Sequence, residues 1–218
     1  MIPEPEEFSY VKSCSIIIIL LVSLTSCNKK AEEKEEMKTI GTIERIDPAF
    51  NSLVSDNAAM EIIAEGYEWS EGTLWVDSHK MLLFSDVPEN IVYKWTEEKG
   101  AQIYLTPSGY TGSEPSQSKE PGANGLTLNK NGKLALCQHG DRRVSIMDAP
   151  LNAPEPRFIA IADNYQGKKF NSPNDLVFSR AGDLFFTDPP YGLPLQMNDP
   201  TKEIPFQGVY RVTPSGQV

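Results

Sequence analysis

The sequence predicts an all-β fold and, within that class, a β-propeller. Past residue 45, short apolar runs alternate with clusters of glycine, proline, asparagine and aspartate, and helical periodicity is hard to find. One pattern occurs three times: a polar residue opens a short apolar strand, a turn follows, and a second apolar strand ends in a polar pair. These stretches begin at Glu71, Asn124 and Asn174, 53 and 50 residues apart, close to the spacing of propeller blades.

Residues 1–27 predict a lipoprotein signal peptide. The apolar run at 16–22 is too short to span a bilayer as a helix but suits the hydrophobic region of an export signal. Leu24-Thr25-Ser26 then leads into Cys27, and this order resembles the lipobox of bacterial lipoproteins, whose cysteine is acylated. We therefore expect a protein of the bacterial cell envelope, held at a membrane by lipid on Cys27. A plain secretory signal is the alternative.

Residues 28–45 predict a charged tether, because the run "KKAEEKEEMK" mixes both signs of charge, as solvated segments do. Asn28 follows the cysteine where some bacteria place an aspartate for retention in the inner membrane. We therefore expect a periplasm-facing protein and favour the outer membrane slightly. The formal net charge of −10 argues against a nucleic-acid partner, which would need a basic surface.

Residues 46–218 are expected to form the first three to four blades of a propeller. The segment 92–100, "VYKWTEEKG", is echoed at 209–216 by "VYRVTPSG", which predicts outer strands that follow the inner hairpin of a blade. The innermost strand of each blade lines a central channel, so the three opening residues should converge at one end of it. Because a closed ring needs about 4–8 blades, we expect the chain to be an incomplete piece of a longer reading frame.

The opening residues Glu71, Asn124 and Asn174 are oxygen donors with little total charge, a set that suits Ca²⁺ or Mg²⁺. For each asparagine the alternative is a turn cap that accepts backbone hydrogen bonds. His139 ends the second strand of its repeat, and it either contacts a substrate or bridges strands. Tyr191 lies in a proline- and glycine-rich turn that could reach over the channel mouth.

Three stretches resemble the gluconolactonase family, which includes regucalcin (senescence marker protein) and luciferin-regenerating enzyme. They read "WSEGTLW", "GANGLTLNKNGKLALCQHGDRRV" and "FNSPNDLVFSRAGDLFFTDPPYGL", and the resemblance covers roughly residues 58–218. It implies a six-bladed propeller with one divalent cation in its channel, often Ca²⁺, with Mg²⁺, Mn²⁺ or Zn²⁺ as alternatives. It also implies hydrolysis of a small sugar-acid lactone, which is a carboxylic ester.

The resemblance also implies roles for individual residues. Glu71 matches the family's first metal ligand, and Asn174 matches an asparagine that binds the metal in some members and the substrate in others. Asn124 matches a channel-lining polar position in the second blade, and His139 matches a frequent histidine of the family, preceded here by Gln138; with Tyr191, these residues are expected to bind the substrate. Two further metal ligands, an asparagine and an aspartate, would fall beyond Val218. Because that aspartate is the family's usual general base, the sequence assigns no catalytic residue.

These expectations combine into one hypothesis, a lipid-anchored, metal-dependent hydrolase of sugar lactones. The sequence leaves open a non-catalytic propeller that binds a sugar or a partner and contains a structural Ca²⁺. It also leaves open a calcium-binding protein without turnover. The oligomeric state is not predicted.

Overall fold

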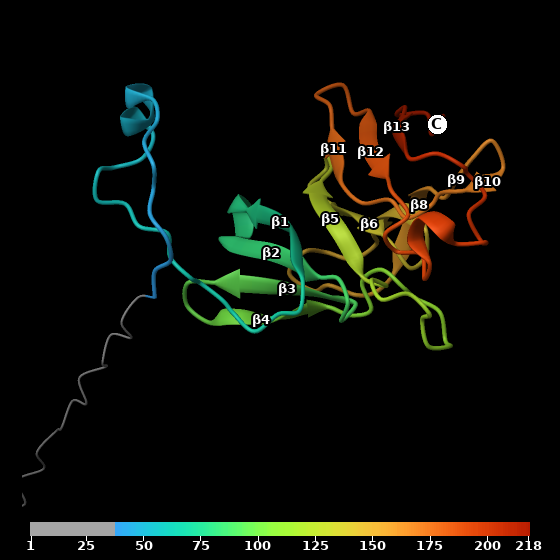
Figure 1. The fold of residues 1–218 in the computed structure, drawn as a ribbon, viewed down its shortest axis with the longest axis horizontal. Helices are drawn as coiled ribbons and strands as arrows, with labels where there is room; N and C mark the ends of the chain where they lie inside the picture. The colour runs from blue at the N-terminus through green and yellow to red at the C-terminus, as the bar shows by residue number, and fades with distance from the viewer. Residues whose placement is uncertain (1–37) are drawn as a thin grey trace, which may run out of the picture. The chain divides into compact units, whose positions relative to one another are not determined.

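The computed structural model describes residues 38–218, and its regular structure is almost entirely antiparallel β-sheet (Figure 1). Three sheets follow one another along the chain, with strand orders β1-β2-β3-β4, β5-β6-β7-β8 and β11-β12-β13. Each is a meander, since neighbours in sequence are neighbours in the sheet, as expected for propeller blades. The predicted all-β propeller fold is confirmed, and the described chain contains three of its blades.

The strands are short, as the sequence pattern indicated. The first blade consists of β1 (Ser70–Val76), β2 (Met81–Asp86), β3 (Ile91–Thr96) and β4 (Gly100–Leu105). The second consists of β5 (Ala123–Leu128), β6 (Leu134–Gln138), β7 (Arg143–Met147) and β8 (Phe158–Ala162). The third consists of β11 (Leu176–Phe178), β12 (Leu184–Asp188) and β13 (Gly208–Val212), and a small ribbon of β9 (Asn164–Tyr165) and β10 (Lys168–Lys169) precedes it.

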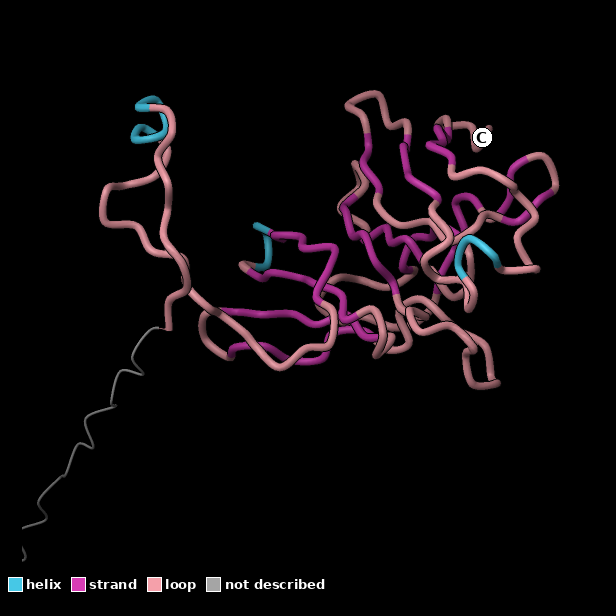
Figure 2. The backbone as a smooth tube through the Cα atoms, viewed as in Figure 1, coloured by secondary structure: helices cyan, strands magenta, loops and turns pink. Residues whose placement is uncertain are grey.

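The helical segments within residues 38–218 are single 3₁₀ turns, drawn in cyan in Figure 2: η1 (Pro48–Ser52), η2 (Asp77–His79) and η3 (Gln196–Asn198). The side chain of Asp47 caps η1 by accepting a hydrogen bond from the backbone N–H of Ala49 at 2.8 Å. None of the helices in this part of the chain is long and apolar enough to cross a membrane.

Two apolar clusters hold the blades together, one on each side of the second sheet. Leu134 and Leu136 of β6 face the first blade, whereas Ala135 and Cys137 face the third. Because β6 is buried on both faces, its sequence is a continuous apolar run instead of an alternating one. Burying one large aliphatic or aromatic side chain stabilises the fold by about 1.5–3 kcal/mol, so these two interfaces dominate the stability.

A polar side chain at the end of the second strand secures each blade. The carboxylate of Asp86 accepts hydrogen bonds from the backbone N–H groups of residues 68 and 69 at 3.2 and 3.1 Å. Asp188 does the same for residues 171 and 172 at 2.8 and 2.9 Å. In the second blade Gln138 takes this place and donates to a backbone carbonyl of the preceding loop at 2.8 Å. The polar residues therefore fix the segment that enters each inner strand.

The outward faces of the first and third sheets are apolar and uncovered by other described residues. Trp75 and Ile103 are about half exposed on the first sheet, and Val177 and Val209 are more exposed on the third. These side chains alternate along their strands with residues that pack against the second blade. In a closed ring such faces pack against neighbouring blades, so these two sheets have the surface chemistry of blades inside a larger propeller.

Gly72 offers a direct test of how closely the first two blades approach each other. Its φ is +57°, and a Cβ atom placed on it would lie 2.0 Å from the backbone oxygen of Asn124. Gly132 also has a positive φ, +72°, but open space around it. Alanine at either position costs about 1 kcal/mol for the backbone strain. Gly72→Ala should cost about 1–3 kcal/mol more, because the carbonyl must move.

Urea unfolding of the full-length protein, followed by tryptophan fluorescence, measures both variants. Equal decreases in the free energy of unfolding for Gly72→Ala and Gly132→Ala would contradict the close approach of the first two blades at Gly72.

Candidate functional site

The three residues that open the inner strands come together at one end of the described blades. Glu71 and Asn124 are the second residues of β1 and β5, and Asn174 lies two residues before β11. The backbone N–H of Gly125 donates to the carbonyl of Asn174 at 2.7 Å, and Gly72 lies against the carbonyl of Asn124. A glycine thus follows Glu71 and another follows Asn124. Because glycine has no Cβ, the next inner strand can approach closely at these points.

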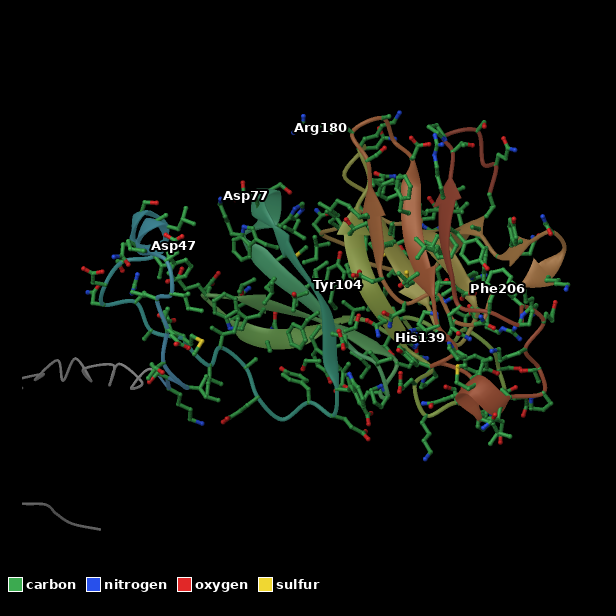
Figure 3. All side chains as sticks on the ribbon, turned by 45° about the horizontal axis from the view of Figure 1, so that its top comes forward. Asp47, Asp77, Tyr104, His139, Arg180 and Phe206 are labelled. Atoms are coloured by element: carbon green, nitrogen blue, oxygen red, sulfur yellow. The ribbon has the colours of Figure 1, made fainter. Side chains whose placement is uncertain are left out.

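His139 lies at this same end, immediately after β6, away from the turns that contain Asp77 and Arg180 (Figure 3). Its side chain is fully buried, and its backbone N–H donates to the carbonyl of Gly122 at 3.2 Å. The ring atom Nε2 lies 3.4 Å from Nδ2 of Asn174. Burial lowers the pKa of His139 to about 4, so the imidazole is neutral at pH 7.

Glu120 is a site residue that the sequence reasoning did not find. Its Oε2 lies 3.8 Å from Nδ1 of His139, and its side chain is only 18% exposed. Burial raises the pKa of Glu120, and the nearby charge of Glu71 raises it further. As an acidic residue in a proline- and glycine-rich loop, it looks like an ordinary exposed charge in the sequence. Only the return of that loop to the start of β5 places it beside His139.

Glu71 and Glu120 form an acidic pair without a compensating side chain. Oε1 of Glu71 accepts a hydrogen bond from the indole N–H of Trp69 at 3.2 Å. Within residues 38–218, neither glutamate forms an ion pair with a lysine or arginine. The two carboxylates are close enough for the charge of Glu71 to raise the pKa of Glu120. Such a pair of like charges is stabilised by a bound cation.

The donor chemistry of this end of the blades fits a hard divalent cation. Glu71 offers a carboxylate oxygen and Asn174 an amide oxygen, the ligand types that Ca²⁺ and Mg²⁺ prefer, and Glu120 adds negative charge nearby. The described residues contain no group of three histidine, cysteine, aspartate or glutamate side chains that could hold a metal ion by itself. The residues present therefore fit part of an oxygen-donor site, and further donors are needed to complete it.

The remaining candidate residues lie around this centre. Asn124 is buried, and no hydrogen bond of its side chain to another described residue is formed. Tyr191 is half exposed, and its neighbour in sequence, Gly192, packs against the Cβ of His139. Beside Asn174, Oδ1 of Asp175 accepts a hydrogen bond from the backbone N–H of Leu176 at 2.8 Å, so Asp175 acts as a local cap.

Comparison with known proteins identifies the family. The family model described as SMP-30/Gluconolactonase/LRE-like region matches residues 69–218. The chain belongs to this gluconolactonase family. A gluconolactonase from Zymomonas mobilis is 39% identical over 197 residues, which are 90% of this chain and 54% of that protein. The chain therefore spans about half the length of this relative.

Solved structures of gluconolactonase-family folds agree with this assignment. A gluconolactonase from Xanthomonas campestris is 27% identical, with a TM-score of 0.66 over 83% of this chain and 56% of that one. A luciferin-regenerating enzyme, 16% identical, has a TM-score of 0.50 over 74% of this chain and 50% of that one, which shows likeness of fold alone. Cys27, the predicted lipidation site, lies outside the described residues.

The buried histidine predicts how stability changes with pH. The unfolded chain binds a proton on His139 near pH 6.5, whereas the folded protein resists protonation until about pH 4. The unfolded state therefore binds more protons in this window, and the stability present above pH 6.5 falls as the pH is lowered. The loss amounts to about 3 kcal/mol when the window is crossed completely.

His139→Gln should remove this part of the acid sensitivity, because glutamine does not titrate. His79→Gln is the matched control, because His79 is the other histidine of the sequence and its side chain is exposed. Urea midpoints of the full-length protein at pH 7 and pH 4.5 give the comparison. Equal losses in the wild type and His139→Gln would contradict the buried, neutral imidazole.

Proposed function

We propose that the protein is a gluconolactonase-like hydrolase that opens small sugar lactones at the channel end of its blades. The observation that carries this proposal is the 39% identity to a gluconolactonase along 90% of the chain. The grouping of Glu71, Asn124, His139 and Asn174 at one end of the inner strands supports it. The chain spans about half of that relative, so the activity of the whole protein is part of this proposal.

Opening a lactone is the hydrolysis of a carboxylic ester. Water adds to the carbonyl carbon, negative charge develops on the carbonyl oxygen, and the ring oxygen leaves as a hydroxyl group. A divalent cation, with Ca²⁺ as our first choice over Mg²⁺, Mn²⁺ and Zn²⁺, supplies polarisation of that carbonyl when bound. We propose that Glu71 and Asn174 hold it, since they present oxygen donors from adjacent parts of the channel end.

The neighbouring side chains suit a polyhydroxylated substrate. Asn124 has donor and acceptor atoms without a partner among the described side chains, and the phenol of Tyr191 is half exposed. We propose that Asn124 and Tyr191 contact the lactone and its hydroxyl groups, whereas the fully buried His139 contacts Asn174. The general base that activates water, an aspartate in the family, is expected outside residues 1–218.

The reaction is tested with the full-length protein and gluconolactone, by measuring proton release in the presence of Ca²⁺. Glu71→Gln should reduce both turnover and Ca²⁺ affinity at least tenfold, because it replaces a charged ligand by a neutral one. Glu97→Gln removes the same charge from an exposed hairpin turn of the first blade and should leave both unchanged. Ca²⁺ binding without proton release from the wild type would overturn the hydrolase and favour the sugar- or partner-binding propeller.

We also propose that Cys27 is acylated and holds the protein at a membrane of the bacterial cell envelope, facing the periplasm, with the outer membrane favoured. The support is the sequence pattern around this cysteine and the charged tether that follows it. Cys27→Ser should abolish incorporation of radiolabelled palmitate and move the protein from the membrane fraction to the soluble fraction. Cys14→Ser should retain the label. Labelled protein from Cys27→Ser would contradict the assignment.

A further inference from the structure

The orientation of the Asn174 amide is controlled by groups outside the proposed metal-binding side chains. Its backbone is fixed on both sides: its N–H donates to the carbonyl of Thr187 at 2.9 Å, and its carbonyl accepts from Gly125 at 2.7 Å. Only the side-chain torsions remain free. The nitrogen and oxygen of an amide exchange places in a half-turn, so the neighbour of the amide decides which of them faces the channel.

That neighbour is His139. The amide nitrogen Nδ2 of Asn174 lies 3.4 Å from the ring atom Nε2. An amide nitrogen only donates hydrogen bonds, so this arrangement requires Nε2 to be an unprotonated acceptor. The neutral ring then carries its proton on Nδ1. Among the described residues no donor reaches Oδ1 of Asn174, and this oxygen is left available for a ligand.

Glu120 accounts for the proton on Nδ1. This buried ring atom forms no hydrogen bond of normal geometry in the described part of the chain, but two acceptor groups of Glu120 lie close to the ring: its backbone carbonyl, and its carboxylate with Oε2 at 3.8 Å. Carbonyl and carboxylate oxygens only accept hydrogen bonds, so both favour the tautomer with hydrogen on Nδ1. The side chain is fully buried and Gly192 packs against its Cβ, so the position of the ring is confined.

We propose that Glu120 and His139 are positioning residues that hold the Asn174 amide with its nitrogen toward His139 and its oxygen toward the channel. Glu120 selects the tautomer of His139, and His139 selects the orientation of Asn174. Such outer groups typically change metal affinity or activity by 10–100-fold when they are removed. The role of Asn174 as a ligand rests on the proposed function, whereas the tautomer and the orientation of the amide do not.

The tautomer is measured directly. The sequence contains two histidines, so His79→Gln leaves His139 as the only one. Long-range ¹H–¹⁵N correlation spectra of the full-length protein with ¹⁵N-labelled histidine distinguish hydrogen on Nδ1 from hydrogen on Nε2. We expect hydrogen on Nδ1 at pH 7. Hydrogen on Nε2 would overturn the proposal, whatever the enzyme assay shows.

Variants at position 139 then test the link to the ligand without a change of net charge. His139→Gln keeps an acceptor near the position of Nε2, and His139→Leu removes it while filling similar space. Calorimetric titration with Ca²⁺ should give wild-type affinity within about threefold for His139→Gln and at least tenfold weaker binding for His139→Leu. Wild-type affinity in His139→Leu would overturn the positioning role.

The outcomes separate this inference from the proposed function. Suppose that the protein binds Ca²⁺ and has hydrogen on Nδ1 of His139 but releases no protons from gluconolactone. This result overturns the proposed hydrolase and still supports the orientation of Asn174. If His139→Leu unfolds, the tautomer measurement still decides, because it uses a protein changed only at the exposed His79.

Discussion

The close approach of successive inner strands is the constraint on which the rest of the structure depends. Gly125 donates its N–H to the carbonyl of Asn174, and Gly72 lies against the carbonyl of Asn124, so each opening residue is brought beside the next. A Cβ atom at either glycine would separate the strands and pull the polar side chains apart. The apolar clusters supply most of the stability, but these backbone contacts decide where the functional groups lie.

This constraint produces a site whose electrostatics are unusual for a surface. Glu71 and Glu120 lie near each other without a basic partner in the described part of the chain, and His139 beside them is neutral because it is buried. Negative charge therefore collects at one end of the inner strands with no positive side chain to neutralise it. A divalent cation is the simplest group that would balance the charge and make use of the free oxygen of Asn174.

The fold could be predicted from the sequence because the blades repeat. A polar opening residue, a pair of apolar strands and a polar strand end recur at regular spacing. Glu71, Asn124 and Asn174 could be found by the same route, since register alone assigns them equivalent places. Glu120 could not, because it belongs to a loop that follows no repeat and reaches His139 only through tertiary structure. The sequence also left open whether His139 contacts a substrate or bridges strands, because its complete burial is visible only in the structure.

Hydrogen bonds also link each blade to the one that follows it in the chain. Ser85 of the first blade donates to Asn124 of the second, Tyr104 donates to Leu151, and Gly125 of the second donates to Asn174 before the third. In these three bonds the donor is synthesised before its acceptor, whereas Gly122, just before the second blade, donates back to Val87, just after β2. A blade leaving the ribosome thus presents both donors and acceptors to the next blade, so assembly in the order of synthesis gives each new blade a template on which to fold.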